Sequence, residues 1–223
     1  MTTRVRTYRL VTPPPWARIS LREDTRRRIE EIVDDVAARH TPAQVPPDHI
    51  GPKKRELVES LMTQVREAQE HGGVDLYIPL ADIHGYSVQA AFVVSEVTPN
   101  ALMTNDEVPD VLASLLADPG TSPVTVDESV WVRRETTAAP TKAMPAPSRR
   151  VEYVTSVPGT PRYWIMAAFT SAGPPVTDPE DPDGVDLLIG LFDAIMTTWR
   201  WVYEPAPSAL VGIGEDSDGV THG

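Results

Sequence analysis

The chain has 223 residues, 41% of them hydrophobic and 23% charged, which is the composition of a globular protein with one sizeable core. Its lack of cysteine excludes disulfide bonds, thiolate metal sites and a cysteine nucleophile. The formal net charge of -12 at pH 7 argues against general nucleic-acid binding, because the phosphate backbone would be repelled.

The N-terminal part of the chain predicts two strands followed by two helices. Short extended runs at residues 7–11 and 16–21 flank three consecutive prolines, which predicts a two-strand opening joined by a turn. Apolar residues then recur at helical spacing over residues 25–40 and again over residues 52–71. The second helix is expected to stop at the Gly72-Gly73 pair, with His71 in its last turn complementing the helix dipole.

From residue 74 onward the apolar period changes to two, which indicates a sheet. The second run in this region is apolar on both sides at its middle and is expected to be a central strand. Val157-Pro158-Gly159-Thr160 is typical of a type II turn between antiparallel strands. The expected elements are strands at 74–78 and 88–94, a short helix at 106–116, strands within 124–132, at 151–157 and at 163–170, and a closing helix at 185–201.

The closing helix has two distinct faces in sequence. One face is apolar and carries Leu188, Leu191, Phe192, Ile195 and Trp199. The opposite face is expected to carry Asp186, Gly190, Asp193, Thr197 and Arg200. This pattern predicts a helix that lies on the sheet and closes the core with its aromatic residues.

The two ends of the chain carry opposite charge. Residues 1–28 hold eight arginines against two acids, whereas residues 171–223 hold ten acids against Arg200. Such asymmetry can bring the ends together or recruit a charged partner. We favour the alternative of a solvated surface, since exposed ion pairs are weak.

Few residues are candidates for chemistry. Asp82 and His84 form the one close pair of an acid and an imidazole outside the helices, and they are weak candidates for catalysis because no Gly-x-Ser-x-Gly sequence supplies a nucleophile. Residues 178–184 resemble a calcium loop but lack carboxylates at the first and last ligand positions. The Lys53-Lys54-Arg55 run is interpreted as a solvated helix surface. We expect no cofactor and no metal.

Domain organisation and location follow from the same patterns. We expect one α+β domain over residues 1–204, followed by an acidic, disordered tail at residues 205–223. No stretch has the length of a signal peptide or of a membrane span, so we expect a cytoplasmic protein. Arginine far exceeds lysine, a usage typical of high-GC bacteria such as actinobacteria.

Three segments carry a resemblance to a known group. Residues 16–21 resemble the opening strand, residues 163–171 the penultimate strand and residues 191–195 the closing helix of the Mog1/PsbP-like proteins. The resemblance implies an antiparallel sheet with helices on its faces, an α/β/α sandwich, and a non-enzymatic role in binding a protein partner, for instance as an accessory to a secretion or envelope system. The alternatives are a small-molecule-binding or hydrolytic enzyme with a pocket near His84, and a membrane-surface protein held by its N-terminal arginines.

Overall fold

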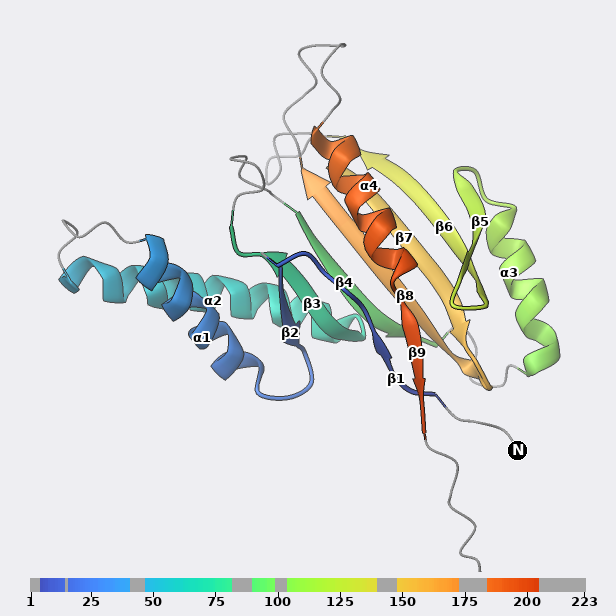
Figure 1. The fold of residues 1–223 in the computed structure, drawn as a ribbon, viewed down its shortest axis with the longest axis horizontal. Coiled ribbons are helices and arrows are strands. Elements are labelled where there is room, and N and C mark those ends of the chain that lie inside the picture. Colours follow the sequence, from blue (N-terminus) through green and yellow to red (C-terminus); the bar gives the residue numbers. More distant parts are fainter. Residues whose placement is uncertain are drawn as a thin grey trace, which may run out of the picture.

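The fold is a seven-stranded antiparallel sheet with helices on both faces, accompanied by a separate two-stranded sheet (Figure 1). The structure is a computed structural model and describes residues 5–14, 16–40, 47–81, 90–98, 104–139, 148–172 and 184–204. In spatial order the large sheet contains β2 (Trp16–Ser20), β3 (Gly73–Pro79), β4 (Ala90–Val97), β8 (Thr160–Ala172), β7 (Ser148–Val157), β6 (Ser129–Ala138) and β5 (Thr121–Val126). The small sheet pairs β1 (Val5–Arg9) with β9 (Arg200–Tyr203).

The helices divide between the two faces and one end of the sheet (Figure 1). They are α1 (Thr25–His40), α2 (Pro47–Glu70), the short 3-10 helix η1 (Asn105–Glu107), α3 (Val108–Leu116) and α4 (Gly184–Thr197). α4 lies on one face against β8, α1 and α2 pack against β2 and β3 on the other face, and α3 lies beside β5 and β6. The predicted α+β class, with an antiparallel sheet between helices, is confirmed.

The core under α4 is built mainly from aromatic side chains. Phe92 of β4, Phe169 of β8 and Phe192 of α4 are each at most 1% exposed, and the rings of Phe169 and Phe192 lie 5.0 Å apart. Trp131 and Trp199 are fully buried and meet edge to face at 5.0 Å. Offset and edge-to-face contacts are the arrangements that aromatic rings prefer. The prediction that Phe192 and Trp199 face the sheet is confirmed.

A second, aliphatic core lies between the helical pair and the sheet. Ile29 and Val33 of α1 and Val65 of α2 pack against Ile19 of β2 and Leu76 of β3. All five side chains are buried. The helical stripes predicted from the sequence supply these contacts.

β4 separates the two cores, as expected for a central strand. Its alternate residues point in opposite directions: Phe92 and Val94 belong to the aromatic core, and Ala91 and Val93 pack against the aliphatic core. The strand is therefore covered on both faces over its middle residues.

Two glycines fix the predicted turns. Gly72 has a φ of 79°, and a Cβ at this position would lie 2.5 Å from the carbonyl oxygen of Glu96, so only glycine fits between α2 and β3. Gly159 has a φ of 73° and follows Pro158 in the β7–β8 hairpin, which matches the predicted type II turn.

The outer edges of the large sheet are protected against further strand pairing. In β2 the Trp16 amide donates to the Pro13 carbonyl, and the Thr25 hydroxyl donates to the Ser20 carbonyl. In β5 the register places Pro123 at a position whose nitrogen faces outward, where no donor is lost. These features disfavour recognition by strand addition.

The chain ends differ from their sequence-based description. β1 and β2 are both strands, as predicted, but they join different sheets, because β1 pairs with β9. The closing helix stops at Thr197 instead of continuing to residue 201. Trp201 lies in β9 because it pairs with Tyr8 of β1, and its amide donates to the Asp127 carboxylate at 2.7 Å; helical periodicity reveals neither long-range contact.

Among the described residues, no N-terminal arginine forms an ion pair with an acid of the C-terminal end. Arg22 pairs with Glu96, and Arg26 pairs with Glu59, so N-terminal arginines find carboxylates in the first half of the chain. Backbone hydrogen bonds between β1 and β9 bring the ends together instead. The acidic tail at residues 205–223 lies outside the described residues, so the disorder predicted for it stays a prediction.

Candidate functional site

The helical pair extends beyond the edge of the sheet (Figure 1). Among the described side chains, burial in α1 ends at Val33 and burial in α2 begins at Val58. Within residues 34–40 and 47–57, which we refer to as the arm, no described side chain is buried, and Val36 is partly buried against the aliphatic core. At the base of the helical pair, the Gln69 side-chain amide donates to the Leu21 carbonyl.

Ion pairs connect the two helices. Arg26 of α1 donates to Glu59 of α2 at 2.7 Å, and Lys54 of α2 donates to Asp34 of α1 at 2.9 Å. The hydrogen bond from Arg26 is the largest cause of a lowered pKa for Glu59. Exposed pairs of this kind stabilise a fold only weakly, so they align the helices without anchoring them. They leave the solvent side of the hairpin accessible.

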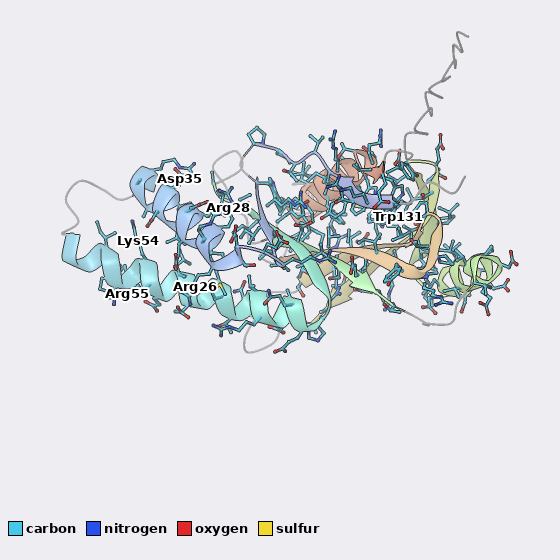
Figure 2. All side chains as sticks on the ribbon, turned by 90° about the horizontal axis from the view of Figure 1, so that it is seen from below. Arg26, Arg28, Asp35, Lys54, Arg55 and Trp131 are labelled. Carbon is cyan, nitrogen blue, oxygen red and sulfur yellow. The ribbon has the colours of Figure 1, made fainter. Side chains whose placement is uncertain are left out.

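A groove of about 700 Å³ runs along this solvent side, between α1 and α2. It is lined by Arg26, Glu30, Val33, Asp34, Gly51, Lys54, Arg55, Val58 and Glu59. Figure 2 shows Arg26, Lys54 and Arg55 along the two helices. Val33 and Val58 are the buried apolar residues of this lining, and charged side chains of both signs surround them.

Two positions in the groove remain open. A Cβ built on Gly51 meets no heavy atom within 4 Å, so this position of α2 has room for an added side chain. Arg55 is exposed and has no ion-pair partner within the described part of the chain. The groove thus combines an apolar floor, an unfilled position and an unpaired cation, a combination suited to a side chain or helix of another protein.

A buried carboxylate lies on the opposite face of the sheet and connects β1 to β2 and β3. Asp75 is 1% exposed and accepts two hydrogen bonds from Arg18, from Nε at 2.9 Å and from the terminal nitrogen at 2.8 Å. The Tyr8 hydroxyl donates a third, and the Tyr77 hydroxyl oxygen lies 3.3 Å from that of Tyr8. Burial raises the pKa of both tyrosines. The carboxylate is occupied by its own chain, so this cluster fastens β1 to the sheet.

A second set of charged groups joins α4 to β6 and β7. Arg133 donates to both oxygens of Asp193 at 3.0 Å, and the Tyr153 hydroxyl donates to the same carboxylate at 2.8 Å. Glu135 accepts from Arg133 at 3.1 Å and also from Arg149. The expectation that Asp193 faces away from the sheet is therefore wrong: the flank of α4 lies over β6 and β7, where an arginine and a tyrosine meet the carboxylate.

The residues singled out in the sequence have different outcomes. Asp82 and His84 lie outside the described residues, and the catalytic hypothesis for them stays a prediction. His71 Nδ1 donates a hydrogen bond to the Glu67 carbonyl oxygen at 2.7 Å, as expected for a polar residue at the end of a helix. In the predicted solvated run, Lys54 forms an ion pair and Arg55 lines the groove.

The groove was not predicted. α2 begins at Pro47, five residues before the expected start, and Pro52 lies inside the helix. The longer helix places Gly51 opposite α1. The sequence offered one signal of the groove, the glycine at position 51. Glycine destabilises a helix relative to alanine, so its presence in an exposed helical turn indicates a role other than helix stability.

Together these observations define an α+β protein with a projecting helical arm and a groove of mixed charge. Comparison of the sequence with protein-family models and with curated proteins gives no match. Among the described residues, no helix combines the length and the apolar character needed to cross a membrane. The same residues contain no group of three or more His, Cys, Asp or Glu side chains placed to hold a metal ion.

Proposed function

We propose that this protein is a non-enzymatic protein-interaction domain whose arm binds an amphipathic helix of a partner protein. A cytoplasmic location and an accessory role in a larger assembly, such as a secretion or envelope system, belong to this proposal. The resemblance of residues 16–21, 163–171 and 191–195 to Mog1/PsbP-like proteins is consistent with such a role.

The arm supports the proposal because it contributes little to either core: among its described side chains, the partly buried Val36 is the one that packs against the aliphatic core. Ordering a residue costs roughly 1–2 kcal/mol of backbone entropy, which burial normally offsets. No described side chain beyond Val33 in α1 or before Val58 in α2 is buried, and Val36 is only partly buried. Their helical order is of use to the protein if the solvent side of the hairpin contacts something else.

The chemistry of the groove indicates the kind of partner. An apolar side chain of an approaching helix would contact Val33 and Val58, and its flanking polar residues would meet the charged rims. The unpaired Arg55 favours an acidic residue on that helix. Because the edges of the sheet are protected, recognition by added helix fits better than recognition by added strand.

A photo-crosslinking residue in the groove tests the proposal. We would place the crosslinker at Gly51, where the added side chain meets open space, and at Ser60 as a control, an exposed residue of α2 outside the groove. We expect one partner segment to crosslink from position 51 and not from position 60. Equal crosslinking from both positions, or none from position 51, would contradict the proposal.

The identified segment, prepared as a peptide, then allows a quantitative test. Gly51→Trp fills the groove and should weaken binding by at least about tenfold, whereas Ser60→Trp should not change it. Arg55→Glu should weaken binding only severalfold, because an exposed ion pair contributes less than about 1 kcal/mol. No variant should lower the melting temperature of the wild type, since none changes a buried residue.

The enzymatic alternative depends on Asp82 and His84. Under the proposal, His84→Ala leaves both stability and peptide binding nearly unchanged. A turnover assay against ester and amide libraries, with the His84→Ala variant as the reference, distinguishes the two functions: activity lost in the variant would favour the hydrolase.

A further inference from the structure

The outer face of α4 is apolar and carries no charge. Leu187, Gly190, Leu191 and Ala194 recur at i, i+3, i+4 and i+7, which places them on one side of the helix. This side is opposite the buried residues that contact the sheet. Leu187 is 64% exposed, Gly190 and Ala194 are exposed, and Leu191 lies at the margin, where it is partly buried and also packs against the aromatic core, as the sequence predicted. In Figure 1, α4 forms the outermost layer on its face of the sheet.

Both carboxylates of α4 are turned away from this face. Asp193 is held by Arg133, and Asp186 is held by Arg149. The chain as a whole has a net charge of -12, and 23% of its residues are charged. An uncharged helix face on such a chain can approach an identical face without the repulsion that the rest of the surface would produce.

The arrangement of large and small residues on this face is self-complementary. If two α4 helices cross antiparallel about a twofold axis between positions 190 and 191, Leu187 lies opposite Ala194 of the second copy. Leu191 then lies opposite Gly190 of the second copy. Each leucine faces a small residue, and a Cβ built on Gly190 meets no heavy atom within 4 Å, so the hollow is open. Large side chains entering small positions are what close helix packing requires.

We propose that two copies of this chain associate through α4, with the helices antiparallel. Because of the twofold axis, each copy contributes the same four residues to the interface, as in most homodimers. One helix face is a small interface, so we expect a weak dimer with a dissociation constant in the micromolar range or above. This inference is independent of the proposed function. If both hold, the dimer presents two arms on the sheet face opposite the interface, which raises the avidity for a multivalent partner.

Sedimentation equilibrium from about 1 µM to about 1 mM protein tests self-association. We expect wild-type protein to form a dimer at the upper end of this range. Leu187→Glu and Ala194→Lys should each weaken the dimer by at least about tenfold, because each buries a charge against an apolar residue. Circular dichroism and melting temperature should stay unchanged, since both positions are exposed.

Mixing the two variants tests the register. In a mixed dimer the new acid of Leu187→Glu faces the new base of Ala194→Lys, while the second Leu187–Ala194 contact is intact. We therefore expect mixed dimers to form more readily than either variant alone. A mixture of Leu187→Glu with Ala194→Glu, which places two acids opposite each other in the mixed dimer, should show no such recovery.

Several outcomes would overturn the inference. Wild-type protein that stays monomeric at about 1 mM has no such interface. A dimer that tolerates Leu187→Glu associates through another surface. Binding of monomeric wild-type protein to phosphatidylcholine vesicles, lost in Leu187→Glu, would assign the face to a membrane surface instead.

Discussion

The ion pair between the half-exposed Arg18 and the buried Asp75 allows a sharp test of how the fold is held. The two partners differ in exposure: the Asp75 side chain is 1% exposed and the Arg18 side chain is 52% exposed. Removing one partner therefore has a different consequence from removing the other. We would compare Arg18→Met, Asp75→Asn and the double variant.

Arg18→Met should be the more damaging change. It leaves the Asp75 carboxylate buried with the Tyr8 hydroxyl as its remaining side-chain donor, and breaking a buried pair in this way costs about 3–5 kcal/mol. Asp75→Asn leaves a half-exposed guanidinium that water can solvate, so we expect a loss of about 1–3 kcal/mol. The double variant should be more stable than Arg18→Met, because no unpaired charge remains.

Urea denaturation followed by tryptophan fluorescence measures the three free energies of unfolding. The slope of the transition should be the same for all variants, so that midpoints report stability. If Asp75→Asn proved more damaging than Arg18→Met, the desolvated carboxylate would not be the source of the cost. An additive double variant would likewise show that the two residues do not interact.

Three further predictions follow from burial, backbone strain and ionisation. Phe192→Ala should cost about 3–5 kcal/mol in urea denaturation, whereas Thr197→Ala on the exposed side of α4 should stay within about 0.5 kcal/mol. Glu128 has a φ of 61° in the β5–β6 turn, so Glu128→Gly should raise the melting temperature, corresponding to about 0.5–1 kcal/mol. Burial raises the pKa of Tyr8 and Tyr153 above the usual 10.0, so the folded state retains these protons more tightly. Their stabilisation is complete below about pH 10 and is lost above it, and Tyr153→Phe should make the urea midpoint fall less steeply between about pH 9 and pH 11.

The core of the fold could be predicted from the sequence because it depends on local periodicity. The stripes around Ile29 and Val65 determine which side of each helix meets the sheet, and the aromatic face of the closing helix identifies Phe192 as a core residue. Turn chemistry at Gly159 identifies the β7–β8 hairpin in the same way. Each of these signals lies within a few residues of the feature that it predicts.

The polar clusters could not be predicted, since their partners are distant in sequence. Asp75 and Tyr77 alternate with the apolar residues of β3, a pattern typical of a strand with one solvated face. β1 crosses that face and brings Tyr8 from 67 positions away. Asp193 is a similar case, because its arginine partner lies 60 positions before it. Sequence periodicity predicts on which face of a strand or helix a residue lies. Which other element packs on that face depends on the tertiary fold.

Two helical glycines connect stability with the proposed contacts. Gly51 and Gly190 both occupy exposed helical positions, and neither would clash with a neighbour if it carried a Cβ. Alanine would favour each helix by about 0.5–1 kcal/mol, so packing within the chain gives no reason for glycine. We expect Gly51→Ala and Gly190→Ala to raise the free energy of unfolding by about this amount. Gly51→Ala should weaken partner binding severalfold and leave dimerisation unchanged, and Gly190→Ala should do the reverse. If both variants gained stability without losing either interaction, the open space at these glycines would not mark contact surfaces.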